Sequence, residues 1–209
     1  MENDFISVIV KKGRLFEVTT NRGDEFHILP KLVKEYKLRS GTEISYQKLE
    51  NIQQESDGIR AYDYAIYSLT RQAHSIGKLK QKLTRKGFNR DVSHPLIKRL
   101  IEEKYLDDRR FAENSVKSLI ERKPAGRSYL VAWLRSKLIE QHLAESVVDE
   151  TLADIDEIDM ALKLLKSRRM YLSKFELETA RRKAYNYLSR RSITYTAAKE
   201  AFIKFAEED

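Results

Sequence analysis

A pattern of apolar side chains repeats three times between residues 61 and 205 and limits the folds that this chain can adopt. Each repeat holds three stretches in which apolar residues are three or four positions apart, the spacing of one face of an α-helix. The positions are Ala65, Ile66, Leu69, Leu79, Leu83, Val92, Leu96, Ile97 and Leu100, then Val116, Leu119, Leu130, Leu134, Leu143, Val147, Val148 and Leu152, then Ala161, Leu162, Leu165, Ala184, Leu188, Ala197, Ala201, Phe202 and Phe205. Units of roughly 50 residues form small cores, so neighbouring units should support one another. We therefore predict a mainly α fold with three tandem three-helix repeats that form an elongated curved rod.

The first part of the chain has a different pattern. "FISVIVKK", "RLFEVTT" and "EFHIL" read as strands separated by turns at Gly13 and at residues 21–23. Pro30 suits the first position of a short helix, and a second short helix near 46–55 is expected to end at residues 56–58. The predicted division is a β-rich N-terminal module at 1–57 and three-helix repeats at 58–107, 108–155 and 156–209.

Composition narrows the setting. The chain has no cysteine, which excludes disulfides and thiol chemistry and suits a reducing compartment. No apolar run approaches the roughly 18–20 residues that span a bilayer. The N-terminus places acidic residues before a short apolar stretch, unlike a signal peptide. We expect a cytoplasmic protein without a membrane anchor.

Positive charge is concentrated in two parts of the chain. The net charge is +8, with ten basic and five acidic side chains in residues 61–107 and twelve and eight in residues 157–209. The two remaining parts are nearly neutral. Such a distribution attracts polyanions or an acidic protein surface, and it does not distinguish between them.

Two basic clusters are the candidate binding faces for a protein partner or nucleic acid. "KLKQKLTRKGFNR" has six basic residues and no acid, and Leu79 and Leu83 should turn inward. The candidates are Lys78, Lys82, Arg85, Lys86, Arg90, Arg168, Arg169, Arg181, Arg182, Lys183, Arg190 and Arg191. An ordinary solvated helix face remains the alternative for either cluster. The tyrosines near both clusters, Tyr62, Tyr64, Tyr67, Tyr185, Tyr187 and Tyr195, can pack in the core or stack on bases.

The stretch "KYLDDRRFAEN" raises the question of catalysis, because two adjacent aspartates can form part of an acid/base or metal site. Asp107 and Asp108 fall between two apolar stripes, where Asp commonly caps a helix N-terminus. No second acid cluster has a matching spacing, and the four histidines are scattered singly. The phosphate-binding and nucleophile motifs GxxxxGK[ST], GxGxxG and GxSxG do not occur. We predict helix capping, with no catalytic residue, metal or cofactor.

Two motifs carry a family resemblance that spans essentially the whole chain. They are the helix pair "RQAHSIGKLKQKLTRKG", with Ser75 and Gly87, and "YLDDRRFA", with Tyr105, Leu106, Asp107, Asp108, Arg110 and Phe111. With the three repeats and the β-rich N-terminal module, they resemble the RecX family of bacterial recombinase regulators. Three positions depart from the usual family pattern. Lys78 stands where a capping-box Glu is usual, "SKLI" lacks a glycine at its turn, and "KPAGR" replaces a glycine–aromatic–glycine stretch.

The resemblance implies a regulatory protein, not an enzyme, whose partner is the RecA recombinase filament. It implies modulation, most simply inhibition, of strand exchange and coprotease activity in recombination, DNA repair and the SOS response. Direct contact with single- or double-stranded DNA is an additional expectation, and we expect a monomer. The alternative is a DNA-binding protein whose helix-turn-helix-like repeats act independently of RecA.

Overall fold

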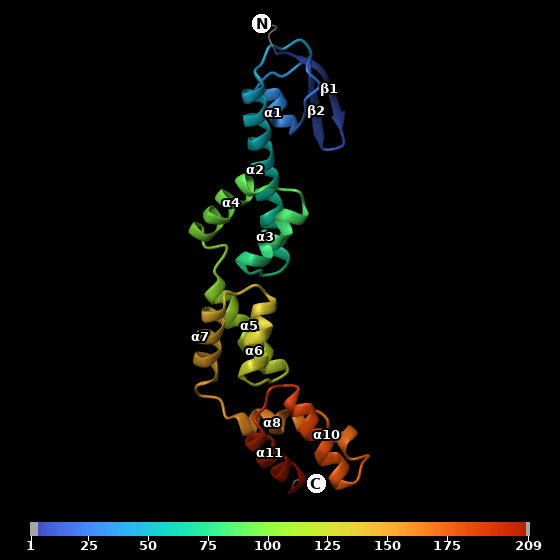
Figure 1. Ribbon diagram of the computed structural model, residues 1–209, viewed down its shortest axis with the longest axis vertical. Coiled ribbons are helices and arrows are strands. Elements are labelled where there is room, and N and C mark those ends of the chain that lie inside the picture. Colours follow the sequence, from blue (N-terminus) through green and yellow to red (C-terminus); the bar gives the residue numbers. More distant parts are fainter. Residues whose placement is uncertain (1–3, 208–209) are drawn as a thin grey trace. The chain divides into compact units, whose positions relative to one another are not determined.

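The computed structural model describes residues 4–207 and is mainly helical, with one small sheet (Figure 1). The strands are β1 (Ile6–Lys12), β2 (Leu15–Thr20) and β3 (Glu25–Ile28). The helices are α1 (Pro30–Glu35), α2 (Tyr46–Arg71), α3 (Ile76–Arg85), α4 (Arg90–Glu102), α5 (Asp108–Arg122), α6 (Arg127–Ser136), α7 (Gln141–Leu152), α8 (Glu157–Lys166), α9 (Arg169–Leu172), α10 (Leu177–Ser189) and α11 (Tyr195–Glu207). The predicted class, mainly α with a β-rich N-terminal module, is confirmed.

The sheet is antiparallel in the order β1-β2-β3. Ile9 pairs with Val18, and Phe16 pairs with Ile28. The β1–β2 turn contains Gly13 at φ +62°, a conformation that glycine adopts without steric cost. Pro30 is the first residue of α1, as predicted. One face of the sheet packs on α1 and the start of α2, through the buried side chains Ile6, Val18, Ile28, Leu32, Leu49 and Ile52.

The prediction of a short helix that ends at residues 56–58 is wrong, because α2 runs without a break from Tyr46 to Arg71. The Ser56 hydroxyl is buried and accepts a hydrogen bond from the Leu29 N–H at 3.0 Å. It also donates to the carbonyl of His27 at 3.4 Å. These partners lie 27 and 29 residues away, so Ser56 fastens the helix to the sheet instead of ending it. Gly58 remains within the helix.

The predicted helical stripes point inward. Leu79, Leu83, Leu130, Leu134 and Leu188 are fully buried. Within the groups, α2 packs on α4, α5 and α6 pack on α7, and α8 and α10 pack on α11. The connection between α8 and α10, the first two long helices of the last group, contains the short helix α9.

The three groups share one turn geometry after their second helix. Phe88, Ile139 and Ile193 each donate a backbone N–H to the carbonyl five residues earlier, on Leu83, Leu134 and Leu188. The residues before them, Gly87, Leu138 and Ser192, have φ of 88°, 64° and 56°. This is the Schellman ending of a helix, which needs a left-handed residue at that point. The turn is therefore retained in the second and third groups, although neither has glycine there.

Two of these turns contact the N-terminus of another helix. The Ser75 hydroxyl, at the start of α3, donates to the carbonyl of Lys137. The Gly126 N–H, at the start of α6, donates to the carbonyl of Arg191 at 2.8 Å. A Cβ on Gly77 would lie 2.6 Å from the Cβ of Leu138, and one on Gly126 would lie 1.9 Å from the Ser192 carbonyl oxygen. Glycine is required at both places for close approach.

The chain divides into two compact units. The first comprises the chain up to Ala73 together with Leu79–Tyr105, and the second comprises His74–Lys78 together with the chain from Leu106 onward. The boundary crosses α3, whose first turn belongs to the second unit.

Candidate polyanion-binding surfaces

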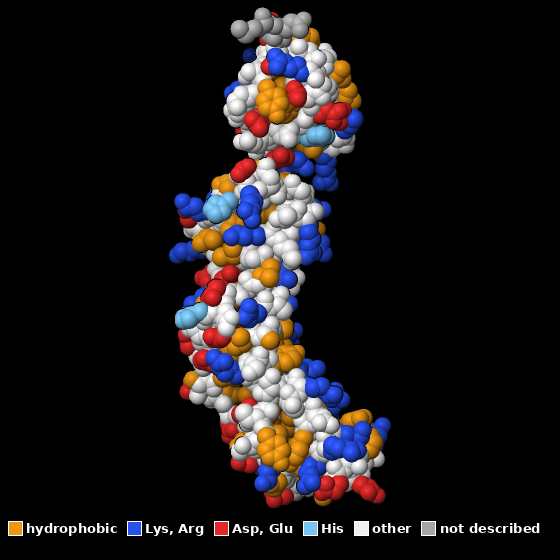
Figure 2. Space-filling view, viewed as in Figure 1, with side chains coloured by type: hydrophobic (Ala, Val, Ile, Leu, Met, Phe, Trp, Pro, Cys, Tyr) orange, Lys and Arg blue, Asp and Glu red, His pale blue; other side chains and the backbone are white. Residues whose placement is uncertain are grey.

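The basic run on α3 forms the first candidate surface. Burial of Leu79 and Leu83 leaves Arg85 and Lys86 exposed and Lys82 half-buried. Arg90, the first residue of α4, is also exposed. Asn89 precedes it and caps the helix by accepting the Val92 N–H at 2.9 Å. Figure 2 shows Lys and Arg side chains over both α3 and α4 on the face it draws. We call Lys82, Arg85, Lys86 and Arg90 the α3 basic face.

Aromatic rings lie beside this face. The Lys86 ammonium lies 5.5 Å from the centre of the Tyr64 ring, and that ring contacts Phe88 at a centroid distance of 6.5 Å. The Arg60 guanidinium lies 5.7 Å from the Phe88 ring. Such cation–π contacts hold the cations against the surface. The Arg60 guanidinium is also paired with the Asp57 carboxylate at 2.6 Å.

Lys78 lies in the first turn of α3, in the second unit. Its backbone N–H donates to the Ser75 hydroxyl oxygen at 3.1 Å, so Ser75 is the N-cap of α3. The side chain is half-buried.

The residues predicted as a second basic cluster come from the start of α9, from α10 and from the turn after α10. Arg181, Arg182 and Lys183 lie on α10, where Arg181 pairs with Glu178 at 2.7 Å. The Lys183 ammonium lies 4.4 Å from the Phe175 ring. Arg190 ends α10 and is exposed.

Arg191 does not belong to the exposed basic surface, and its prediction as a binding residue there is wrong, because the residue is only 4% exposed. Its guanidinium lies 4.7 Å from the ring of Tyr129 on α6. The side chain therefore packs against the first turn of α6.

The other two predicted arginines, Arg168 and Arg169, line an open cavity of about 760 Å³ in the second unit. We call it the basic cavity. Six of its twelve lining residues are Lys or Arg, and no Asp or Glu among the described residues lines it. The basic residues are Arg122, Lys123, Lys163, Lys166, Arg168 and Arg169, and the others are Pro124, Leu164, Ser167, Met170, Tyr171 and Tyr187.

Sequence reasoning missed four of these cations because they come from separate segments. Arg122 and Lys123 end α5, whereas Lys163 and Lys166 are three positions apart on α8. The spacing on α8, opposite the buried Leu164 and Leu165, was the available signal. This spacing shows that Lys163 and Lys166 point outward, but it does not show which residues lie beside them.

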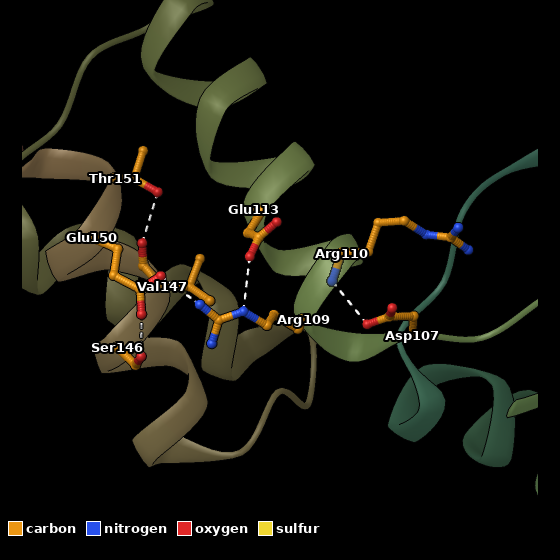
Figure 3. Close-up of polar contacts among 8 residues, drawn as sticks. All are labelled: Asp107, Arg109, Arg110, Glu113, Ser146, Val147, Glu150 and Thr151. Atoms are coloured by element: carbon orange, nitrogen blue, oxygen red, sulfur yellow. Dashed lines mark hydrogen bonds and ion pairs between the residues drawn. The ribbon is translucent and has the colours of Figure 1, made fainter. Parts of the chain in front are cut away.

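The aspartate pair caps two different helices. The Asp107 carboxylate accepts the Arg110 N–H at 2.9 Å (Figure 3), which confirms it as the N-cap of α5. The Asp108 carboxylate accepts the Ile76 N–H at 2.8 Å and so caps α3. Nearby, Arg109 contacts Glu113 at 3.0 Å and Glu150 at 2.5 Å.

The other residues of the family motif differ in burial. Leu106 is 1% exposed, and Phe111 is partly buried against the core of α5–α7. Tyr105 is 53% exposed, so it contributes little to the packing.

Among residues 4–207, no group of three His, Asp or Glu side chains is placed to hold a metal ion. No helix in the same range is long and apolar enough to cross a membrane.

These features define a helical protein with tandem three-helix groups, an N-terminal sheet module and basic surfaces. The family description "RecX, first three-helix domain" matches residues 61–100. A regulatory protein RecX of Chlorobium phaeobacteroides is 30% identical over 146 residues, which cover 70% of this chain and 93% of that protein. The chain belongs to the RecX family of regulatory proteins.

Further relatives extend the match along the chain. A regulatory protein RecX of Pelodictyon phaeoclathratiforme is 29% identical over 141 residues, covering 68% of this chain and 86% of the relative. One of Streptococcus mutans is 24% identical over 197 residues, covering 94% of this chain and 75% of the relative.

Solved structures share the fold. A crystal structure of a regulatory protein RecX has a TM-score of 0.62 at 20% identity, covering 99% of this chain and all of that one. A RecX structure from Lactobacillus salivarius has a TM-score of 0.61 at 18% identity, covering 72% of this chain and 97% of that one.

Proposed function

We propose that this protein binds the RecA nucleoprotein filament in the cytoplasm and lowers its strand-exchange and coprotease activities. It would thereby act in DNA repair and the SOS response, as a monomer and without catalysis of its own. The observation that carries the proposal is membership of the RecX family, shown by 30% identity over 93% of a RecX relative. The basic surfaces support it, because a filament of protein on DNA offers acidic and phosphate groups.

The α3 basic face is the proposed contact with the filament. Arg85, Lys86 and Arg90 are exposed, and the aromatic rings beside them can pack against a partner. Charged contacts between proteins control the encounter rate and the orientation of the complex. We assign the cations of α10 and the basic cavity to the same regulatory role, as a second contact region.

The test is co-sedimentation of the purified chain with RecA filaments on single-stranded DNA, with naked DNA as the reference. The informative variant reverses three charges, Lys82→Glu, Arg85→Glu and Lys86→Glu. A matched control reverses three exposed charges of the N-terminal module, Lys31→Glu, Lys34→Glu and Lys37→Glu. The first variant should bind at least about tenfold more weakly, since like charges then face the partner.

The control should retain binding, since its charge change is equal but is placed elsewhere. Equal binding by both variants would show that the α3 basic face is not the contact. Binding to naked DNA with no added affinity for RecA would favour the independent DNA-binding protein.

A further inference from the structure

We propose that residues 8–12 of β1, the open β1 edge, bind an extended acidic segment of a protein partner as an added strand. The inference goes beyond the proposed function, because it gives the N-terminal module a peptide-binding site of its own. It requires neither RecA nor nucleic acid.

The register of the sheet leaves backbone groups of the open β1 edge pointing outward. β1 lies at one edge of the sheet, with β2 in the middle (Figure 1). In an antiparallel sheet, alternate residues of the middle strand bond to opposite neighbours. The Thr20 N–H donates to the Asp24 carbonyl at 2.9 Å, on the side of β3. The β2 residues opposite Ile9 and Lys11 are two and four positions before Thr20, so they also face β3. The N–H and C=O groups of Ile9 and Lys11 therefore point away from the sheet.

Other outward groups of the sheet are covered by the protein itself. On the β3 edge, the His27 N–H donates to the side-chain oxygen of Gln53 on α2 at 3.0 Å. At the start of β1, the Ile6 N–H donates to the Thr42 carbonyl at 3.0 Å. Within residues 4–207, no such hydrogen bond reaches the outward groups of the open β1 edge. A bare strand edge is a template on which another strand can pair.

The side chains of the open β1 edge also suit an added strand. Val8 and Val10 alternate with the outward residues and are 49% and 46% exposed. Apolar side chains of an added strand would lie beside these valines on the same face of the sheet. In this mode of recognition, main-chain hydrogen bonds supply affinity and alternate side chains supply specificity.

Charge selects the occupant. Lys12 is paired with Glu17 at 2.7 Å, whereas Lys11 and Arg14 are exposed and have no ion-pair partner among the described residues. A second copy of the chain would bring the same cations to the new strand pair, and like charges across a strand pair are destabilising. An acidic segment instead places carboxylates beside Lys11 and Arg14. The lysines that oppose self-association therefore favour an acidic strand.

The test is amide hydrogen exchange of the whole chain, followed by NMR, with the synthetic peptide acetyl-Glu-Thr-Val-Thr-Val-Thr-Glu-amide. The peptide has acids at both ends, so either strand direction places one near Lys11. In excess peptide, exchange at Ile9 and Lys11 should slow about tenfold or more, because these amides exchange only from the unbound fraction. The amides of Val8 and Val10, which already face β2, should change far less.

Two variants separate the backbone contribution from the charge. Lys11→Pro removes an outward N–H that the β1–β2 ladder does not use, so it should abolish binding and leave the melting temperature nearly unchanged. Lys11→Ala keeps that N–H and should retain weaker binding. Two peptides make the same separation without altering the protein. One is N-methylated at every residue and should not bind, and the other has lysines in place of the glutamates and should bind about tenfold more weakly.

Four results would overturn the proposal. One is unchanged exchange at Ile9 and Lys11 at millimolar concentrations of the acidic peptide. Another is equal binding of the N-methylated peptide, which would show a contact that does not use strand pairing. The third is equal binding of the lysine peptide. The fourth is protection of Ile9 and Lys11 that rises with protein concentration alone, which would assign the open β1 edge to a second copy of the chain.

Discussion

The carboxylate of Asp108 accepts a hydrogen bond from the backbone N–H of Ile76, 32 residues earlier, at 2.8 Å. Asp107, its neighbour, caps the helix to which Asp108 belongs. Two adjacent aspartates therefore cap the N-termini of two different helices, α3 and α5. This division of roles explains the aspartate pair without invoking chemistry.

Removing either cap should destabilise the second unit. Asp107→Ala and Asp108→Ala should each lower the free energy of unfolding by about 1 kcal/mol, since each leaves a helix N–H without its side-chain acceptor. The Asn variants, which keep an oxygen acceptor, should lose much less. Urea unfolding followed by circular dichroism measures the difference, and Asn variants as unstable as the Ala variants would contradict the capping roles.

The glycines that contact the Schellman turns should be sensitive to a single methyl group. Gly126→Ala should be strongly destabilising, because the new Cβ would lie 1.9 Å from the rigid Ser192 carbonyl oxygen. Gly77→Ala should cost less, because its nearest atom is the Cβ of Leu138 at 2.6 Å. Gly58→Ala is the control: nothing lies within 4 Å, and alanine should stabilise the interior of α2 by up to about 1 kcal/mol. Melting temperatures in any other order would contradict this packing.

Within the family motif, Leu106 should contribute more to the stability of the fold than its neighbour Tyr105. Leu106→Ala should lower the unfolding free energy by about 2–5 kcal/mol, as expected for a fully buried leucine. Tyr105→Ala should change it far less, because that side chain is 53% exposed. Similar losses of stability for the two variants in urea unfolding would be inconsistent with the observed burial.

Acid should weaken the second unit through two carboxylates. The Arg127 guanidinium lowers the pKa of Asp149 below its ordinary value of 3.8. Backbone N–H groups of His142 and Leu143 lower the pKa of Glu140 below 4.5. A lowered pKa means that the stabilisation is complete above the ordinary value and is lost as the pH falls through the folded one.

The measurement is the urea midpoint of the wild type and of Arg127→Ala between pH 6 and pH 3. At pH 6 the wild type should have a higher urea midpoint than Arg127→Ala. The difference between the two midpoints should shrink toward pH 3 as Asp149 protonates. A difference that stays constant with pH would rule out this pairing as the cause.

Local features were predictable from the sequence because neighbours along the chain create them. The burial of Leu79 and Leu83 follows from helical spacing, and the capping role of Asp107 follows from its residue type at a helix start. Features that depend on distant residues were not predictable. Ser56 continues α2 because its hydroxyl meets a strand 27 to 29 residues away, and Arg191 is buried because Tyr129 lies beside it.

The basic cavity was also not predictable, because its residues come from distant parts of the chain. Arg168 and Arg169 are adjacent and stand out as a pair, whereas Arg122 and Lys163 join them only through the packing of α5 and α8 against their neighbours. Charge counts therefore indicated a polyanion or an acidic protein surface as the partner, and they placed one buried cation, Arg191, among the exposed ones.

The proposed regulation of the RecA recombinase is tested most directly by the rate of RecA-driven strand exchange with increasing amounts of the purified chain. We expect a rate that falls as the protein is added and recovers when the Lys82→Glu, Arg85→Glu, Lys86→Glu variant replaces it. A strand-exchange rate that stays the same at every concentration of the wild-type protein would contradict regulation of RecA by this chain.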